Sequence, residues 1–230
     1  MKAQQPMARR RDSAASADLF AAPAGPAGPL EVVRDVVLLR GFAAPGAALL
    51  AEVERVARAA PFRHLETPGG GRMSVAMTNC GPLGWVSDRS GYRYSPTDPL
   101  SGKPWPAMPA VLLDLARRAS RAAGFGDFEP DACLVNRYEP GARMGAHQDR
   151  DEGDLAQPIV SVSLGIPAVF EWFGERRSGA SQRLLLHDGD VLAWGRSARL
   201  GYHGVRRIEA AEHPLTGASR INLTFRRARP

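Results

Sequence analysis

The C-terminal half of the chain is divided into short segments by clusters of turn-forming residues. Sequences such as EPGA, GIPA, ERRSGAS and HDGD supply the Gly, Pro and Asp residues that turns require. Between them, strand character recurs near residues 131–138, 158–165, 168–173, 182–187, 190–195, 198–206 and 219–226. Many short strands at this spacing predict an all-β sandwich or barrel for this half.

The N-terminal half predicts a smaller helical part. Apolar residues recur at helical spacing over 46–60 and 109–123, and strand character appears from residue 31. Between the helices, 67–108 is rich in Gly, Pro and aromatic residues, which is typical of ordered loops and short hairpins. The predicted fold class is therefore α+β, with helices packed on a C-terminal jelly roll.

The expected organisation is one domain with an N-terminal extension. Residues 1–29 are rich in Ala, Pro, Gly and Arg, and we expect them to form a tail that cannot bury a core. Residues 30–230 would form the single domain, with a jelly-roll core over 126–230 and a lid over 67–108. A monomer is the simplest expectation for a chain of this size.

Charge and cysteine content indicate which kinds of binding partner and which cellular compartment to expect. The formal net charge is +6 and the isoelectric point about 10.0, a field that favours polyanions such as nucleic acid. Cys80 and Cys133 have no CxxC or CxxH neighbour, so they indicate neither a zinc site nor a disulfide framework. No stretch is as long and apolar as a membrane span, and no clear secretory signal is present. We therefore expect a cytoplasmic protein without a membrane partner.

The motif HQD supplies the first candidate metal ligands, His147 and Asp149. In an extended chain, residues two apart project to the same side, so both side chains can reach one cation. His203 is a candidate third ligand. Two imidazoles and one carboxylate form the facial ligand set of non-haem Fe(II) oxygenases. An HxD pair alone is weak evidence, because it is common by chance.

The last predicted strand, RINLTFR, alternates strictly between polar and apolar residues. Its polar residues are Arg220, Asn222, Thr224 and Arg226. One interpretation is an amphipathic edge strand with a solvated polar face. The other is a barrel strand whose polar face points inward, where two guanidinium groups can bind a dicarboxylate. Asn136 and Tyr138 form a second polar pair at the same period, although they could simply end a strand before the EPGA turn.

Together these motifs resemble the AlkB-type branch of the 2-oxoglutarate dioxygenases. The resemblance extends to TPGGGRMSVAMTNCGPLGW, GYRYSPTDP, KPWPAMP, PDACLVNRYEPGA, HQDRDE, PIVSVSLGIPAVF, RLLLHDGDVLAWG and NLTFR, and covers essentially residues 30–226. It implies a double-stranded β-helix that uses Fe(II), 2-oxoglutarate and O2. In that family the N-alkyl carbon of a damaged base is hydroxylated, and the adduct collapses to an aldehyde and the repaired base.

The resemblance also assigns roles to individual residues. The implied iron ligands, which are also the catalytic residues, are His147, Asp149 and His203. The implied 2-oxoglutarate-binding residues are Asn136, Tyr138, Arg220, Asn222 and Arg226, with Arg220 at the distal carboxylate and Arg226 near the chelating end. The implied substrate-binding residues are Trp85, Tyr92, Tyr94, Asp151, Arg183 and Met77.

A flipped base needs an aromatic wall and a polar partner for its edge. Trp85 would be the wall, and Asp151, in strand phase with Asp149, would accept a hydrogen bond from an exocyclic amine. Core packing is the plain alternative for Met77 and the tyrosines, and a solvated surface is the alternative for Asp151 and Arg183. Gly71 and Arg72 depart from the family pattern in the lid.

Three functions are compatible with these observations. The first is oxidative demethylation of N1-methyladenine and N3-methylcytosine in single- or double-stranded DNA, and in RNA. The second keeps the cofactors but changes the substrate to tRNA, a small molecule or a protein side chain. The third is a non-catalytic barrel that binds single-stranded nucleic acid. The polar strand face favours the enzymes over the barrel, because binding alone does not require Arg220 and Arg226 there.

Overall fold

Two antiparallel sheets and a separate hairpin make up the fold of residues 28–230, which the computed structural model describes. Most of the predicted tail over 1–29 lies outside the described residues. The major sheet contains, in spatial order, β1 (Leu30–Val33), β2 (Val36–Leu39), β12 (Val191–Trp194), β9 (Ile159–Gly165), β14 (Arg220–Arg226), β7 (Ala132–Tyr138), β4 (Arg72–Cys80) and β3 (Arg63–Glu66). The minor sheet contains β11 (Gln182–Leu186), β10 (Ala168–Gly174), β13 (Tyr202–Val205) and β8 (Met144–His147).

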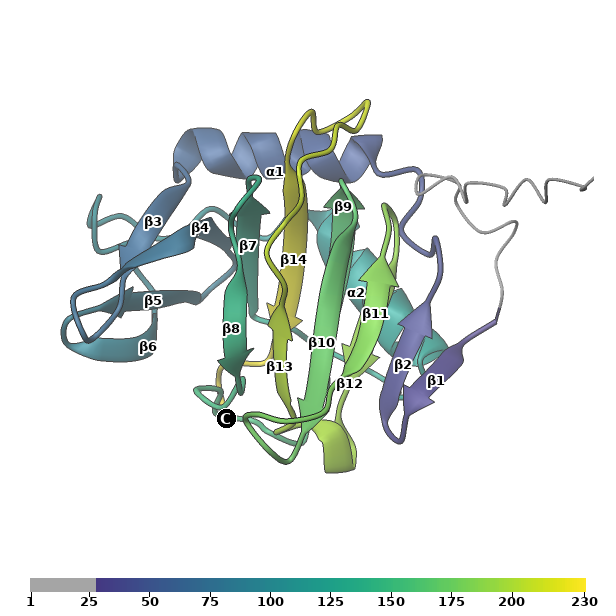
Figure 1. Ribbon diagram of the computed structural model, residues 1–230. Helices are drawn as coiled ribbons and strands as arrows, with labels where there is room; N and C mark the ends of the chain where they lie inside the picture. The colour runs from purple at the N-terminus through teal and green to yellow at the C-terminus, as the bar shows by residue number, and fades with distance from the viewer. Residues whose placement is uncertain (1–27) are drawn as a thin grey trace, which may run out of the picture.

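Two helices cover the outer face of the major sheet. These are α1 (Ala47–Ala59) and α2 (Ala110–Ala122), and Figure 1 shows both behind the sheet, with the minor sheet in front. Their buried residues join one apolar cluster with alternate residues of β14, namely Ile221, Leu223 and Phe225. Burial of this apolar area is the main stabilising contribution on this side of the sheet.

The second core lies between the two sheets and is more polar. Because β14 alternates, Arg220, Asn222, Thr224 and Arg226 point away from the helices into this space, and all four are buried. The strand lies between β9 and β7, with Asn222 opposite Ser163 on one side and Asn136 on the other. It is therefore a central strand with an inward polar face, and the solvated edge-strand interpretation is wrong.

A hairpin projects beside the sheets at the β3 and β4 edge (Figure 1). It consists of β5 (Gly84–Asp88) and β6 (Gly91–Ser95), with Trp85 opposite Tyr94. Asn79, buried on β4, anchors its base by exchanging two side-chain hydrogen bonds with the backbone of Trp85. We call β5–β6 the lid hairpin.

Several predicted element boundaries differ from the structure. The segment 67–108 contributes the nine-residue strand β4 to the major sheet, so the sheets begin well before residue 126. The expected strand near residue 31 is divided in two by a turn at Asp35, whose φ is +61°. The expected strand over 198–206 begins only at Tyr202, because a 3-10 turn occupies Arg196–Ala198. Strand β8 was not predicted, since MGAH contains no β-branched or aromatic residue that favours strands.

The two cysteines are less isolated than their sequence positions suggest. Cys80 on β4 and Cys133 on β7 are register partners, and both are buried free thiols. Within residues 28–230, no helix is long and apolar enough to cross a membrane.

Candidate active site

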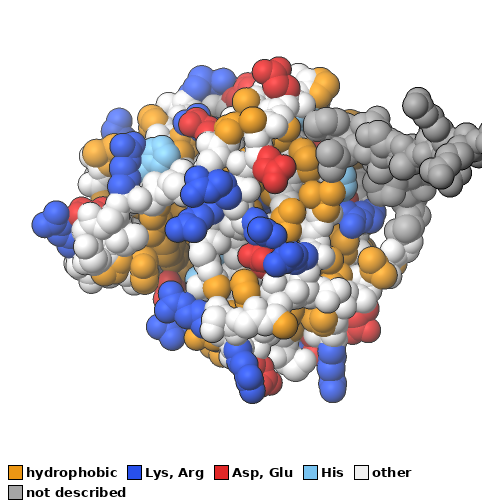
Figure 2. All heavy atoms as spheres, in the orientation of Figure 1, with side chains coloured by type: hydrophobic (Ala, Val, Ile, Leu, Met, Phe, Trp, Pro, Cys, Tyr) orange, Lys and Arg blue, Asp and Glu red, His pale blue; other side chains and the backbone are white. Residues whose placement is uncertain are grey.

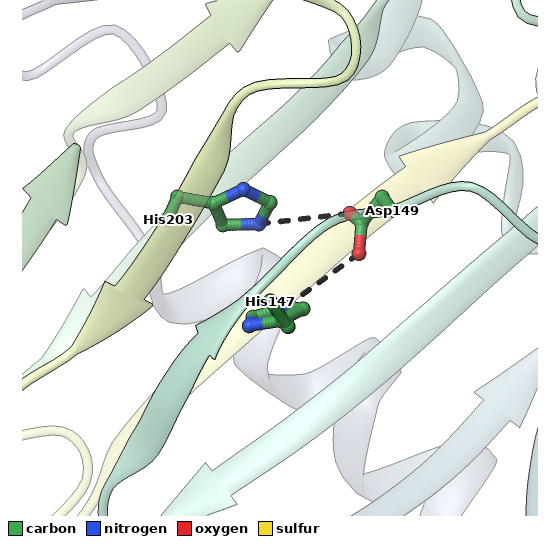
Figure 3. Close-up of side chains that lie close together, drawn as sticks. All are labelled: His147, Asp149 and His203. Carbon is green, nitrogen blue, oxygen red and sulfur yellow. Dashed lines mark ion pairs between the residues drawn. The ribbon is translucent and has the colours of Figure 1, made fainter. Parts of the chain in front are cut away.

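His147, Asp149 and His203 converge at the end of the minor sheet. His147 ends β8, Asp149 follows it, and His203 lies opposite His147 on the neighbouring strand β13. One ligand atom from each residue lies within 4.8 Å of the others. Figure 3 shows both rings facing the Asp149 carboxylate, which is 3.6 Å from Nε2 of His147 and 3.9 Å from Nε2 of His203. This geometry fits a single cation held by three facial ligands.

Backbone hydrogen bonds orient both imidazole rings. Nδ1 of His147 lies 2.9 Å from the carbonyl oxygen of Gly145, and Nδ1 of His203 lies 3.0 Å from that of Gly201. A carbonyl only accepts, so each Nδ1 carries the proton and each Nε2 presents its lone pair toward Asp149. Ligand orientation of this kind is typical of histidines that bind metal ions.

The protonation states of the triad suit a metal cation. Burial, reinforced by neighbouring His147, lowers the pKa of His203 to about 4, so this imidazole is neutral at physiological pH. Burial alone would raise the pKa of Asp149, but Arg226 and the histidines outweigh it and hold that pKa well below its usual range. Nε and Nη2 of Arg226 donate to Oδ2 of Asp149 at 3.0 and 2.7 Å. The site therefore combines imidazole nitrogen donors, of which that of His203 is neutral, with one ionised carboxylate.

Acidification is expected to destabilise the metal-free protein between pH 6.5 and 4. The unfolded chain takes up a proton on His203 near pH 6.5, whereas the folded protein does so only near pH 4. The free energy of unfolding should therefore fall by up to about 3 kcal/mol as the pH drops through this window. Chemical denaturation of metal-stripped protein would measure the slope. A His203→Gln variant should show a shallower slope, and equal slopes would contradict the assignment.

The inward face of β14 lines a narrow inner cavity of about 50 Å³ beside the triad. Arg220 is almost fully buried there, and among the described residues only its Nη2 has a hydrogen-bond partner, Ser163 Oγ at 2.9 Å. Burial lowers the pKa of Arg220, yet an arginine stays protonated. A buried guanidinium with unpaired Nε and Nη1 is costly unless an anion completes it. The residue therefore fits the carboxylate of a bound organic acid.

The other predicted 2-oxoglutarate-binding residues lie around the same cavity, and they differ in whether their polar atoms already have hydrogen-bond partners. Tyr138 lies with its ring 5.0 Å from the Arg220 guanidinium. Asn136 keeps a buried amide oxygen without a partner among the described residues. Asn222 donates to Ser161 Oγ at 2.8 Å and to the carbonyl of Val162 at 3.0 Å, so its amide nitrogen is already occupied within the sheet. These contacts fit Asn222 as a residue that positions the strand.

A larger outer cavity of about 520 Å³ connects the triad to the lid hairpin. The lining residues are Met73, Met77, Trp85, Tyr92, Leu134, Met144, His147, Gln148, Asp149, Arg150, Asp151, Glu152, Arg177, Tyr202 and Arg226. Trp85 and Tyr92 stack with their ring centroids 5.4 Å apart, and Trp85 Nε1 donates to Asp151 Oδ2 at 2.9 Å. The cavity thus combines an aromatic wall, a carboxylate and apolar methionines, which is suitable for a planar base.

The structure brings some predicted substrate residues to this cavity and leaves others outside it. Met77, Trp85, Tyr92 and Asp151 line it, although Asp151 lies in a loop, because β8 ends at His147 and the strand-phase argument fails. Tyr94 does not line it. Arg183 lies on β11, 3.4 Å from Glu171 and outside the lining set.

Several lining residues were missed by sequence reasoning, namely Met73, Leu134, Met144, Gln148, Glu152, Arg177 and Tyr202. Met73 shares its strand with Met77 and the same strand face, so alternation along β4 could have identified it. Arg177 lies in the turn between β10 and β11 and donates to the carbonyl of Ala146 at 3.3 Å. No pattern in ERRSGAS distinguishes Arg177 from Arg176. Figure 2 shows Lys and Arg side chains spread across this face of the molecule, with fewer carboxylates between them.

Comparison with known proteins supports one family. The model of the 2OG-Fe(II) oxygenase superfamily matches residues 35–226. The chain is 54% identical over 212 residues to the alpha-ketoglutarate-dependent dioxygenase AlkB of Salmonella typhimurium, covering 92% of this chain and 97% of that protein. It is 33% identical over 170 residues to the DNA N(6)-methyladenine demethylase ALKBH1C of Arabidopsis thaliana, covering 63% and 37%. The structure of OsALKBH1 superposes with a TM-score of 0.75 at 29% identity, covering 84% and 96%.

Proposed function

The chain belongs to the 2OG-Fe(II) oxygenase superfamily, and on that premise we propose that it oxidatively removes alkyl groups from damaged nucleic-acid bases. Its cofactors are Fe(II) and 2-oxoglutarate, with O2 as co-substrate. The observation that carries the proposal is one continuous site. Two imidazoles and a carboxylate meet beside a buried arginine with unpaired donors, and a cavity with an aromatic wall opens onto them.

Each part of the chain has a defined task in the proposed reaction. His147, Asp149 and His203 would hold the iron, and Arg226 would keep the Asp149 carboxylate ionised and oriented. Arg220 would bind the distal carboxylate of 2-oxoglutarate, with Tyr138 and Asn136 beside it. The iron and 2-oxoglutarate, when bound, supply the oxidation of the N-alkyl carbon. The protein orients the substrate and excludes water from the inner cavity.

The outer cavity would receive a base that has left the stack. A base within a duplex cannot reach a buried metal, so it must be flipped out or already unpaired. Trp85 would stack on it and Met77 would contribute apolar surface to the same cavity, while the Asp151 carboxylate suits a base made cationic by N1 or N3 methylation. Arg150 and Arg177 are exposed at the rim, where they can neutralise phosphates. Contacts from Tyr92, Tyr94 and Arg183 to the substrate strand remain predictions.

Trp85→Ala is expected to raise the KM for a methylated oligonucleotide about tenfold or more. Base–aromatic stacking contributes on the order of 1–3 kcal/mol per base, and the substitution also removes the bond to Asp151. The KM for 2-oxoglutarate should be unchanged, because Trp85 does not line the inner cavity. Steady-state kinetics with each substrate varied in turn would measure both values. If the KM for the oligonucleotide and the KM for 2-oxoglutarate rose together, the substitution would have disturbed the structure generally, and the stacking role of Trp85 would not be supported.

Substrate class can be tested by the rate of succinate formation. Oligonucleotides of one sequence, with or without a single N1-methyladenine or N3-methylcytosine, would be compared as DNA and RNA. We expect the methylated DNA to stimulate turnover and the unmethylated one not to. Stimulation by tRNA, a free nucleoside or a peptide instead would favour the second enzyme function. Nucleic-acid binding without any 2-oxoglutarate turnover would favour the non-catalytic barrel.

We further propose that the protein acts as a monomer in the cytoplasm. Two buried free thiols opposite each other fit a reducing compartment.

We also propose that two residues before the lid hairpin influence substrate preference. Gly71 lies in the exposed turn between β3 and β4, and Arg72, also exposed, is the first residue of β4. Both depart from the family pattern.

A further inference from the structure

A cluster of largely buried charged side chains lies in the wall of the outer cavity. Glu152 is its centre, with only 2% of its side chain exposed. The hydroxyl of Tyr94 donates to Oε1 of Glu152 at 2.6 Å, and Nε of Arg226 lies 3.4 Å from the same oxygen. Nη2 of Arg199 donates to the other carboxylate oxygen at 3.1 Å. Glu152 therefore joins the lid hairpin to the strand that carries Arg226.

Arg199 fixes the loop that carries Glu152. Its side chain is 3% exposed, and all three nitrogens of its guanidinium are engaged. Nε donates to the carbonyl of Gln157 at 2.9 Å, and Nη1 donates to the carbonyl of Asp149 at 2.7 Å. With the bond to Glu152, one side chain thus holds both ends and the interior of the 149–157 loop. That loop begins at a candidate iron ligand and includes Asp151.

The lid hairpin is attached on two sides. On the side of the major sheet, Asn79 bonds to the backbone of Trp85, Ser87 and Arg89 donate to Glu66 at the end of β3, and Trp105 Nε1 donates to the carbonyl of Ser95. On the side of the cavity, the recorded bonds to the 149–157 loop are Tyr94 to Glu152 and Trp85 to Asp151. Asp151 is exposed and is the proposed partner of the base edge, so its bond to Trp85 competes with substrate. The Tyr94–Glu152 bond is buried and does not compete with it.

We propose that Arg199, Glu152 and Tyr94 form a latch that holds the lid hairpin over the cavity. Arg199 and Glu152 are positioning residues, and Tyr94 is the part of the lid that they hold. This deepens the proposed function and rests on it for the identity of the substrate. It also changes the interpretation of Tyr94, whose hydroxyl binds Glu152 instead of the substrate strand. Burial raises the pKa of Tyr94 well above its usual value, so the hydroxyl keeps its proton and can donate.

Amide hydrogen exchange of the metal-free protein tests the latch without any need for catalysis. Tyr94→Phe should increase exchange about tenfold in residues 84–95, because it removes one hydrogen bond to a charged acceptor. Tyr92→Phe is the matched control, since Tyr92 lies on the same strand and its hydroxyl makes no hydrogen bond within residues 28–230. It should leave the exchange of 84–95 unchanged. Equal exchange in Tyr94→Phe and the wild type would overturn the proposal, as would a uniform increase that includes β9 and β14.

A second variant tests the direction of the coupling. Arg199→Lys keeps the charge, but its single ammonium nitrogen cannot replace the three guanidinium nitrogens that reach Gln157, Asp149 and Glu152. It should increase exchange in the 149–157 loop and in 84–95, whereas Tyr94→Phe should affect 84–95 alone. Faster exchange in the 149–157 loop with unchanged exchange in 84–95 would show that Arg199 does not act on the lid hairpin through Glu152. In kinetics, Tyr94→Phe should raise the KM for the oligonucleotide several-fold and leave kcat nearly unchanged. If the protein proved inactive on every nucleic acid, the exchange experiment would still test the latch, because it does not depend on catalysis.

Discussion

Asp149→Ala is expected to abolish iron binding and dealkylation together. The carboxylate is the only anionic member of the triad, and it faces Nε2 of both histidines. Changes to groups that merely orient metal ligands typically cost about 10–100-fold in affinity or activity, so loss of a ligand should exceed this range. Iron content after anaerobic loading and the rate of methyl loss would measure the two effects.

The same substitution removes the acceptor of both hydrogen bonds that Arg226 makes to Asp149 and leaves its buried charge with Glu152 Oε1 alone, 3.4 Å from Nε. Arg226 is 7% exposed and donates twice to Asp149. Removing one partner of a buried ion pair costs about 3–5 kcal/mol, so Asp149→Ala should also lower the unfolding temperature. Asp149→Asn is the control, because its amide oxygen can still accept from Arg226. We expect it to lose iron with a smaller loss of stability. A stable Asp149→Asn variant that retained full activity would contradict the ligand assignment.

Arg220→Met is expected to remove 2-oxoglutarate binding while stabilising the protein without ligand. The guanidinium is buried, bonds only to Ser163 among the described residues, and has unpaired Nε and Nη1. A methionine of similar length buries no charge, and replacement of buried ion pairs by well-packed apolar residues is often neutral or stabilising by about 1–4 kcal/mol, so removal of a buried guanidinium with fewer partners should stabilise the ligand-free protein at least as readily. Loss of a charge-assisted contact to the carboxylate should cost about 2–5 kcal/mol of binding.

These opposite effects make the prediction specific. Thermal denaturation should show a higher midpoint for Arg220→Met than for the wild type when neither contains 2-oxoglutarate. Added 2-oxoglutarate should raise the midpoint of the wild type and leave that of the variant unchanged. Arg220→Lys serves as control, since it keeps a charge but not the bidentate geometry. A variant destabilised in the absence of ligand would show that Arg220 serves the fold rather than the cofactor.

The division of β14 into one apolar and one polar face was predictable because its alternation is strict. In RINLTFR every second residue is apolar, and Ile221, Leu223 and Phe225 have to face a core. What the strand's sequence alone could not decide was whether the opposite face meets solvent or a second sheet. That depends on pairing with β7 and β9, which are distant in sequence.

The lid and the latch were much less predictable. Tyr94 and Glu152 are 58 residues apart, and Arg199 is 47 residues from Glu152, so no local period links them. Glu152 lies in the acidic run DRDEGD, where a solvated charge is the plain interpretation. The helices were predicted closely because their apolar stripes and their Pro and Gly boundaries are local signals. Non-local ion pairs leave no such pattern in one sequence.

The central claim is the dealkylation of a nucleic-acid base, and mass spectrometry of one defined lesion tests it most directly. Purified protein loaded with Fe(II) would be incubated with 2-oxoglutarate, O2 and an oligonucleotide carrying a single N1-methyladenine. We predict loss of the methyl group, with succinate formed in step, and no loss when 2-oxoglutarate is omitted. An oligonucleotide that stays intact while 2-oxoglutarate is consumed would contradict the substrate assignment. No consumption of either by folded, iron-loaded protein would contradict the enzymatic account itself.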